Sequence, residues 1–266
     1  MKTQTPESRR EQPQQEAYLD FFEKDWAEIH EGQPSEVGLL NKGRPERKEI
    51  CEDVKLKNKE KGLFIVADGV GSAQGWLASR ETARVVWEQL GETLDRAIEN
   101  NIQEALRKGE NPLDRITKYV AAQMLACVKQ ADVRINALAA QRRLERSTTT
   151  LSLAKLVELP DGKGTHVQRL FYVNIGDSRM YLQHKGKELK QVTRDDSMLE
   201  QSVRLGEMKA EQARAIDQDS DPRLLDAASR AMAKLRNFII KSVGSGESME
   251  DVNVFFVDVK PTDRLA

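Results

Sequence analysis

The amino-acid sequence predicts an α+β fold in which long helices and an antiparallel sheet occupy separate parts of the chain. Two observations support this prediction. Residues 76–138 contain long stretches whose apolar residues recur every three or four positions, and residues 148–193 contain short apolar runs separated by turn sequences. Short strands joined by tight turns are typical of an antiparallel meander, because parallel strands need long crossover connections.

The chain begins with a polar segment. Residues 1–16 are rich in Gln, Glu and Arg, which predicts a disordered lead-in. Aromatic residues then recur at near-helical spacing between residues 18 and 26, which predicts a short amphipathic helix that docks on the protein body or on a partner. A loop rich in Gly and Pro follows. We therefore divide the chain into an N-terminal extension, residues 1–35, and a domain, residues 36–266.

The domain is expected to open with a buried strand and two long helices. Residues 63–67 form an apolar, partly β-branched run bounded by Gly62 and Gly69, which is typical of a buried strand. A helical pattern runs from about residue 76 to residue 107, and Pro112 then stands at the first turn of a second helix. That helix carries an apolar stripe made of Ile116, Val120, Met124, Val128, Ala131, Ile135 and Leu138. The stripe predicts a core-facing side and hence a helical hairpin.

After Ser147 the period of the apolar pattern changes. Strand-like runs occupy residues 148–159, 166–176, 179–186 and 188–193, with turn sequences between them. A more polar helical segment is expected at roughly 197–235, and a last strand at 252–260. No internal repeat is visible.

Composition excludes several classes of protein. The 266 residues include 42 basic and 43 acidic side chains, so no net field attracts nucleic acid or an anionic membrane. No apolar run approaches the roughly 20 residues of a membrane span. Cys51 and Cys127 are the only cysteines, which argues against a disulfide framework or a thiolate zinc site and favours a reducing compartment. We expect a cytoplasmic protein with no nucleic-acid or membrane partner.

The stretch GLFIVADGVGSAQG, residues 62–75, places an apolar run directly before Asp68 and a cluster of glycines. Three interpretations compete: a plain strand-to-helix turn, a phosphate-cradling loop, and a metal ligand presented at a strand end. The glycines give GxGxxxG rather than the GxGxxG of a dinucleotide loop, and two long helices follow where a second parallel strand would be needed. Asp68 would also repel a pyrophosphate, so the nucleotide interpretation is disfavoured.

Carboxylates recur near strand ends. Glu52 and Asp53 precede the first expected strand, Asp68 ends it, and Asp177 lies in a turn between two later strands. Each has an ordinary explanation, because Asp is common in caps and turns. As a set, however, acids at the strand ends of one sheet can converge, and their repulsion then needs a counter-charge. Mg²⁺ and Mn²⁺ take oxygen ligands and suit a site without His or Cys.

Five motifs in order make a specific resemblance. GLFIVADGVGSAQGWLAS, RSTTTLSLAKL, FYVNIGDSRMYL and LKQVTRDDSMLE follow KEICEDV, which resembles an acidic Glu-Asp box. Together with RNFIIKSVGSGESMEDVNVFFVDVKPTDRL, they resemble the PPM family of metal-dependent Ser/Thr protein phosphatases, the type-2C phosphatases, in its bacterial style. The resemblance spans roughly residues 40–265.

The resemblance implies a four-layer αββα sandwich, with two antiparallel sheets flanked by helical hairpins. It also implies two Mn²⁺ or Mg²⁺ ions and a weaker third. By this resemblance Asp68 bridges both metals, the Gly69 carbonyl binds one of them, Glu52 and Asp53 act mainly through metal-bound waters, and Asp177 helps to hold the third. A metal-activated water would attack phosphoserine or phosphothreonine in a protein substrate, so Asp68 and Asp53 are the expected catalytic residues.

Two departures from the family pattern set the alternatives. Lys48 stands where an arginine usually holds the phosphate, and it would bind phosphate as a point charge without the bidentate fork of arginine. The family pattern continues past residue 266 into strands that carry two further metal-binding aspartates, so the domain is expected to lack its last strands. The leading interpretation is a protein Ser/Thr phosphatase. The alternative is a catalytically impaired phosphatase-like module that binds phosphoproteins or a regulatory partner.

Overall fold

The computed structural model describes residues 35–38, 52–70, 74–144, 146–161, 164–218, 230, 232–235 and 237–266. Nearly all of them belong to the compact unit Glu36–Ala266, which is separate from the unit Met1–Ser35. The expected N-terminal helix and Lys48 lie outside the described residues. None of the helices in the described part of the chain is both long and apolar enough to cross a membrane.

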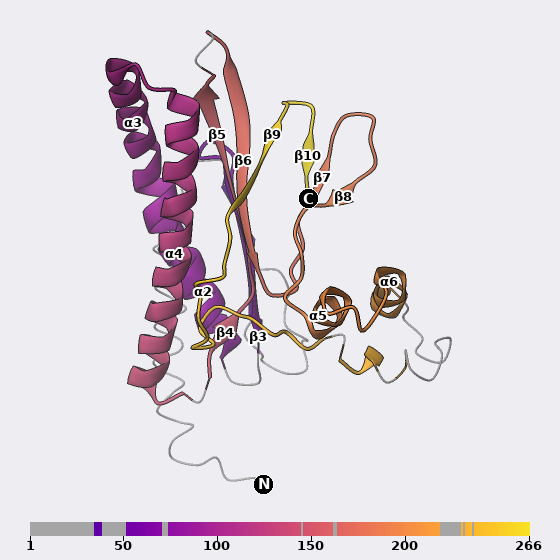
Figure 1. Cartoon of the computed structure of the whole chain (residues 1–266). Helices are drawn as coiled ribbons and strands as arrows, with labels where there is room; N and C mark the ends of the chain where they lie inside the picture. The colour runs from indigo at the N-terminus through magenta and orange to yellow at the C-terminus, as the bar shows by residue number, and fades with distance from the viewer. Residues whose placement is uncertain are drawn as a thin grey trace. The chain divides into compact units, whose positions relative to one another are not determined.

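The larger sheet forms the centre of the unit (Figure 1). Its strand order is β1-β2-β3-β5-β6-β9, and β4 pairs with the end of β3. The strands are β1 (Ser35–Gly38), β2 (Asp53–Asn58), β3 (Leu63–Val70), β4 (Thr148–Thr149), β5 (Leu151–Pro160), β6 (His166–Ile175) and β9 (Phe255–Val259). The pairings from β2 through β9 are antiparallel, as the tight turns in the sequence predict.

A smaller sheet packs on one face of the larger one. It consists of β7 (Tyr181–Gln183), β8 (Lys190–Gln191) and β10 (Arg264–Leu265), in the order β10-β7-β8. The two sheets meet in a core of Ala154, Leu170 and Met180, and partly buried side chains from both sheets surround this core. The molecule is therefore a sandwich of two antiparallel sheets at this point.

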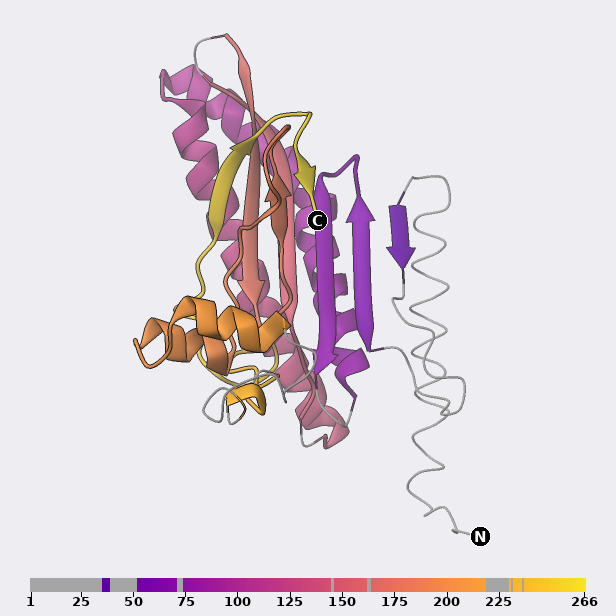
Figure 2. The same cartoon turned by 90° about the vertical axis from the view of Figure 1, so that its right-hand side faces the viewer.

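Helices cover the opposite face of the larger sheet (Figure 2). A continuous helical segment comprises α2 (Gly75–Val86), a π-helical stretch η1 (Trp87–Thr93) and α3 (Leu94–Lys108). It ends at Gly109 in a left-handed conformation, with φ of 68°. The second long helix, α4 (Pro112–Arg142), starts where Pro112 indicates, and the Asn111 side chain accepts a hydrogen bond from the Leu113 N–H.

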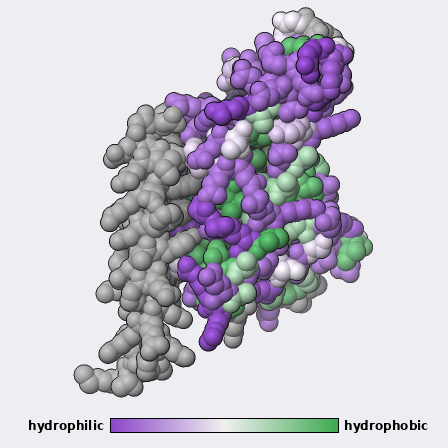
Figure 3. Space-filling model, turned by 90° about the vertical axis from the view of Figure 1, so that its left-hand side faces the viewer, coloured by the Kyte–Doolittle hydropathy of each residue, from purple (hydrophilic) through white to green (hydrophobic). Residues whose placement is uncertain are grey.

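The apolar stripe of α4 is buried as predicted. Ile116, Val120, Met124, Val128, Ala131 and Ile135 are at most 1% exposed, and Leu138 is half-buried. The outer face of this helical layer is mainly hydrophilic, with smaller hydrophobic patches (Figure 3). Exposed apolar side chains on α3 and α4 include Leu106 and Val133. The long helices thus bury one face in the core, and the other is largely polar.

The polar segment after the strands forms two short helices, α5 (Met198–Arg204) and α6 (Ala210–Gln218), instead of one long one. Gly206 lies between them with φ of 75°, a backbone conformation that interrupts a helix. Both helices lie below the smaller sheet, beside one end of the larger sheet (Figures 1 and 2). Residues 219–229 lie outside the described part of the chain.

The α+β prediction, with antiparallel sheets and flanking helices, is confirmed, and the strand expected at residues 63–67 is part of β3, but the strand before it was not predicted. Asp53 does not precede the sheet: it opens β2, a strand that the sequence analysis did not assign. Val54, Leu56 and Asn58 are buried while Lys55 and Lys57 are half-buried, so the strand alternates with period two. The lysines make this segment look like a polar loop when hydrophobicity alone is considered.

Candidate metal centre

Asp53 and Asp68 form a directly opposed pair on adjacent antiparallel strands. The β2–β3 register pairs Asp53 with Asp68, so the two carboxyl groups project from the same face of the sheet. The Asp68 side chain reaches the surface, yet the protein atoms around it displace enough water to raise its pKa. This burial, a hydrogen bond with Asp53 and the charges of Asp53, Asp177 and Glu52 raise the pKa of Asp68 to about 7. The other three expected carboxylates therefore all act on Asp68.

Two threonines hold the Asp68 backbone in place. The Asp68 carbonyl accepts hydrogen bonds from the Thr150 N–H at 2.8 Å and from the Thr149 hydroxyl at 2.9 Å. The Asp68 N–H donates to Thr150 Oγ1 at 3.0 Å. Both backbone groups of Asp68 are thus satisfied by the segment that links β4 to β5, which restricts where its carboxylate can lie.

Gly69 lies in backbone contact with two neighbours of the site. Its N–H donates to the Glu52 carbonyl at 3.1 Å. A Cβ at Gly69 would lie 2.4 Å from the Gly75 carbonyl carbon and 2.8 Å from the Glu52 carbonyl oxygen. Only glycine therefore fits where β3 ends against the first turn of α2. This close backbone contact is a second reason for glycine at positions 69 and 75, beside the turn and the metal-binding carbonyl expected from the sequence.

Asp177 reaches the same region from the turn after β6. Gly176 precedes it with φ of 94°, and a Cβ there would lie 2.7 Å from Thr150 Cγ2, so the turn packs closely on the Asp68 segment. Burial is the main cause that raises the pKa of Asp177, and the charges of Asp195 and Asp217 raise it further. The charge of Asp177 in turn contributes to the raised pKa of Asp68.

An ion cluster around Arg179 borders Asp177. The Arg179 guanidinium donates to both carboxylate oxygens of Asp195 at distances of 2.6 to 3.2 Å, and its Nη1 lies 2.6 Å from Asp217 Oδ2 on α6. Hydrogen bonding to Asp195 is the main cause that raises the pKa of Arg179. Sequence analysis missed this cluster, because Asp217 is about 40 residues away along the chain and carries no local signal.

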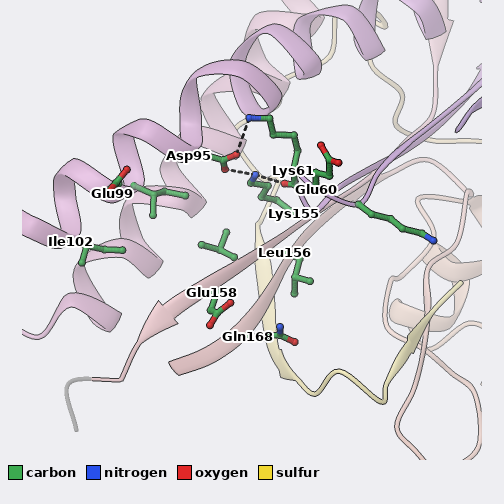
Figure 4. A pocket seen from close by; sticks show the side chains of 13 residues that line it. Glu60, Lys61, Asp95, Glu99, Ile102, Lys155, Leu156, Glu158 and Gln168 are labelled. Atoms are coloured by element: carbon green, nitrogen blue, oxygen red, sulfur yellow. Dashed lines mark hydrogen bonds and ion pairs between the residues drawn. The ribbon is translucent and has the colours of Figure 1, made fainter. Parts of the chain in front are cut away.

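Two hollows in the described part of the chain differ in their position relative to these carboxylates. A groove of about 830 Å³ is lined by Asp177, Arg179 and residues of α5 and α6. The other hollow, of about 370 Å³, lies at the opposite end of β3, beside Lys61, Asp95 and Lys155 (Figure 4). The groove therefore offers the space next to the candidate site where a substrate can approach.

The donor chemistry of the site suits a hard divalent cation. Asp53, Asp68, Asp177 and Glu52 offer carboxylate oxygens, and the charges of Asp53, Asp177 and Glu52 raise the pKa of Asp68, an effect that a bound cation would oppose. Within the described ranges, however, no three His, Cys, Asp or Glu side chains already converge at metal-ligand spacing. Such a set suits a cation whose shell is completed by water, as Mg²⁺ commonly requires.

Thiol chemistry is not supported at Cys127. This side chain is fully buried in α4, and burial raises its pKa to about 12. A thiol in this state is not a nucleophile near neutral pH.

Comparisons with known proteins agree with this architecture. A sequence model of the family described as Protein phosphatase 2C matches residues 43–262. The Mycobacterium tuberculosis serine/threonine phosphatase PstP/Ppp is similar with a TM-score of 0.54 and 22% identity, over 87% of this chain and 74% of that one. The PPM Ser-Thr phosphatase MsPP from Mycobacterium smegmatis, in complex with cacodylate, is similar with a TM-score of 0.53 and 23% identity, over 87% and 73%.

A further solved structure, of the catalytic domain of the phosphatase PstP in complex with two manganese ions, gives a TM-score of 0.53 and 21% identity over 87% of this chain and 73% of that one. At this level of identity, the solved structures establish a shared fold. No match was found among curated proteins. The family match, in contrast, extends over most of the chain. The chain therefore belongs to the protein phosphatase 2C family, a family of enzymes.

Proposed function

We propose that this protein hydrolyses phosphoserine and phosphothreonine in proteins at a binuclear Mn²⁺ or Mg²⁺ centre built around Asp68 and Asp53. The observation that carries the proposal is the cross-strand Asp53–Asp68 pair, with Asp177 and Glu52 close enough to raise the pKa of Asp68. The solved PstP structure with two manganese ions supports a two-metal centre in a protein of the same fold.

In the reaction, water attacks phosphorus, the bond from phosphorus to the serine or threonine oxygen breaks, and inorganic phosphate and the free hydroxyl are released. Paired divalent cations, when bound, supply an activated water and neutralise charge on the phosphoryl group. Asp68 would hold these cations, and the Gly69 carbonyl would add an oxygen beside them. Glu52 and Asp53 would act mainly by holding metal-bound water, and Asp177 would hold a weaker third cation.

Thr149 and Thr150 would keep Asp68 in place through the reaction cycle, because they satisfy both of its backbone groups. The groove lined by Asp177 and Arg179 would admit the polypeptide that flanks the phosphorylated residue. Lys48 would bind the phosphate of the substrate as a point charge. For Lys48→Ala we expect a raised KM for a phosphopeptide with a smaller effect on kcat, and an unchanged KM would contradict the assignment.

Phosphorylated proteins in the cytoplasm are the proposed substrates, and the amphipathic segment at residues 18–26 is proposed to dock on the domain or on a regulatory partner. The balanced charge of 42 basic and 43 acidic residues supports a protein substrate over nucleic acid.

The deciding experiment measures phosphate release from a phosphothreonine peptide with Mn²⁺, with Mg²⁺ and with a chelator. We expect cation-dependent release, and a loss of at least about a hundredfold in Asp68→Asn and Asp53→Asn, because each removes several kcal/mol of metal-dependent stabilisation of the transition state. Asp114→Asn is the matched control, since Asp114 is an exposed acid in the first turn of α4.

Two outcomes would contradict this proposal. Release that persists in the chelator would remove the metal from the mechanism. Phosphopeptide binding without release, at any cation concentration, would instead support the alternative of a phosphatase-like binding module.

A further inference from the structure

One of the two hydrogen bonds that pair Asp68 with the neighbouring strand ends on a side-chain hydroxyl instead of a backbone carbonyl. The register pairs Val66 with Ser152 and Gly69 with Thr149, so counting along both strands places Asp68 opposite Thr150. The Thr150 N–H donates to the Asp68 carbonyl at 2.8 Å, as in a regular antiparallel pair. The return bond from the Asp68 N–H goes to the Thr150 hydroxyl at 3.0 Å.

The same hydroxyl reaches the turn that carries Asp177. Thr150 Oγ1 lies 2.7 Å from Ser178 Oγ, within hydrogen-bond distance. A hydroxyl has one donor and two acceptor positions, so Thr150 can accept from the Asp68 N–H and still bond to Ser178. The methyl group of Thr150 packs against Gly176, where a Cβ would lie only 2.7 Å from Thr150 Cγ2.

Thr150 is well suited to keep these contacts. Its side chain is fully buried, and a β-branched side chain has a strongly restricted χ1. The hydroxyls of Thr148 and Thr149 differ in their connections, because they donate to backbone carbonyls of Val70 and Asp68 on β3. Among the residues that the structure describes, no other threonine hydroxyl joins the Asp68 segment to the Asp177 turn.

We propose that Thr150 is a positioning residue that sets the spacing between Asp68 and Asp177, and through it the affinity of the site for divalent cations. The inference rests on the proposed function, because that function makes both aspartates metal ligands. Groups that orient ligands without touching the metal typically change metal affinity by roughly tenfold to a hundredfold when removed.

The test compares Thr150→Val, which keeps the shape and removes the hydroxyl, with Thr150→Ser, which keeps the hydroxyl. Thr148→Val is the matched control, since Thr148 is 4% exposed and its hydroxyl donates to a single backbone carbonyl. Ser178→Ala removes the hydroxyl that Thr150 bonds to, at a half-buried position. This variant replaces Thr150→Val in the test if Thr150→Val does not fold.

The first readout is amide hydrogen exchange, measured by NMR without metal. Thr150→Val should exchange the Asp68 amide faster than wild type, because its acceptor is gone, while Thr150→Ser and Thr148→Val should match wild type. In Ser178→Ala, the chemical shifts of both the Asp68 and the Gly176 segments should move.

The second readout is Mn²⁺ affinity, measured by calorimetric titration. We expect about tenfold weaker binding in Thr150→Val and Ser178→Ala, and binding within about twofold of wild type in Thr150→Ser and Thr148→Val, at matched thermal stability. The inference is overturned if Thr150→Val keeps wild-type Mn²⁺ affinity, whatever its exchange at Asp68.

The two readouts separate this inference from the proposed function. Absence of Mn²⁺ binding in the wild-type protein would contradict the proposed metal-dependent phosphatase activity. The amide exchange rate of Asp68 in Thr150→Val and the chemical shifts of the Asp177 turn in Ser178→Ala need no metal. They would then still decide whether Thr150 links the Asp68 segment to the Asp177 turn.

Discussion

Gly69 and Gly75 illustrate how single residues shape the candidate site. Their backbones touch where β3 ends and α2 begins, and a Cβ on either would lie about 2.4 to 2.5 Å from a backbone carbonyl carbon of the other. Backbone atoms on both sides cannot rotate away as a side chain can. The close approach brings α2 against the strand end that carries Asp68.

We therefore predict that Gly69→Ala lowers the free energy of unfolding by about 3 kcal/mol or more, at the upper end of overpacking costs. Urea unfolding with an unchanged m value measures the loss. Gly109→Ala is the comparison, because Gly109 has φ of 68° but nothing within 4 Å of its Cβ position. That change should cost about 1 to 2 kcal/mol, from backbone strain alone. Equal losses in the two variants would show that the Gly69–Gly75 contact is not tight.

At the scale of elements, Lys155 ties α3 to the sheet. This lysine on β5 is 1% exposed, and its Nζ donates to Asp95 Oδ1 at 2.6 Å and to the Lys61 carbonyl (Figure 4). Burial is the main cause that lowers the pKa of Lys155, and the Asp95 charge opposes that effect. The ammonium group thus depends on Asp95, whereas Asp95 is 43% exposed and has water as an alternative partner.

This asymmetry predicts unequal effects of two substitutions. Asp95→Asn should lower the free energy of unfolding by about 1 to 2 kcal/mol, a reduced cost because Asp95 is partly solvated. Lys155→Met should change it by less than about 1 kcal/mol, because an apolar side chain of similar length fills the buried space. Thermal or urea unfolding measures both. A larger loss in Lys155→Met than in Asp95→Asn would contradict the dependence of the lysine on its partner.

One ion pair and one buried side chain fix helix α6. Within the described ranges, the Arg179–Asp217 pair is the one ion pair that joins α6 to the turn between β6 and β7, and Ile216 is the helix residue that is fully buried. Both partners of the ion pair are 32% exposed, so salt screens part of their attraction.

Asp217→Asn should therefore increase the rate of tryptic cleavage after Arg214 by about two- to fivefold, as expected for an ion pair worth up to about 1 kcal/mol. High salt should increase the wild-type rate and leave the variant unchanged. Glu211→Gln, an exposed acid on the same helix, is the control and should cleave like wild type. An equal increase of the cleavage rate in Asp217→Asn and Glu211→Gln would show that net charge, and not the Arg179–Asp217 ion pair, determines how often the helix opens.

At the scale of the whole molecule, cation binding and folding should be linked. Asp68 lies on β3, and the carboxylates that raise its pKa come from the start of β2, from Glu52 just before it and from the turn after β6, so a cation that binds them joins separate parts of the chain. A ligand that binds only the folded state stabilises it by mass action.

Mn²⁺ at ten times its dissociation constant should add about 1.4 kcal/mol of stability, which raises Tm by about 3 to 5 °C for a domain of this size. A chelator should reverse the shift, and Asp68→Asn should abolish it. A rise that is equal in Asp68→Asn would assign the stabilisation to some other cation site.

Local patterns in the sequence predicted much of this fold. The stripe of α4, the start of that helix at Pro112 and the β5–β6 hairpin all follow from spacing or turn residues within a few positions. The motifs also identified Asp53, Asp68 and Asp177 as a set. The strand β2 was missed because Lys55 and Lys57 hide its period-two burial, and the π-helical stretch at Trp87–Thr93 interrupts a segment that reads as one regular helix.

The sequence by itself determined the class of fold, the family resemblance and the identity of the candidate carboxylates, because these depend on residue type and local spacing. Tertiary structure alone decided that Asp53 lies opposite Asp68, that Thr150 touches both the Asp68 and the Asp177 segments, and that Arg179 reaches Asp217. Those contacts depend on strand register and on packing between residues far apart in the chain, and a shift of one residue in the β2–β3 register would place the Asp53 side chain on the face of the sheet opposite to Asp68.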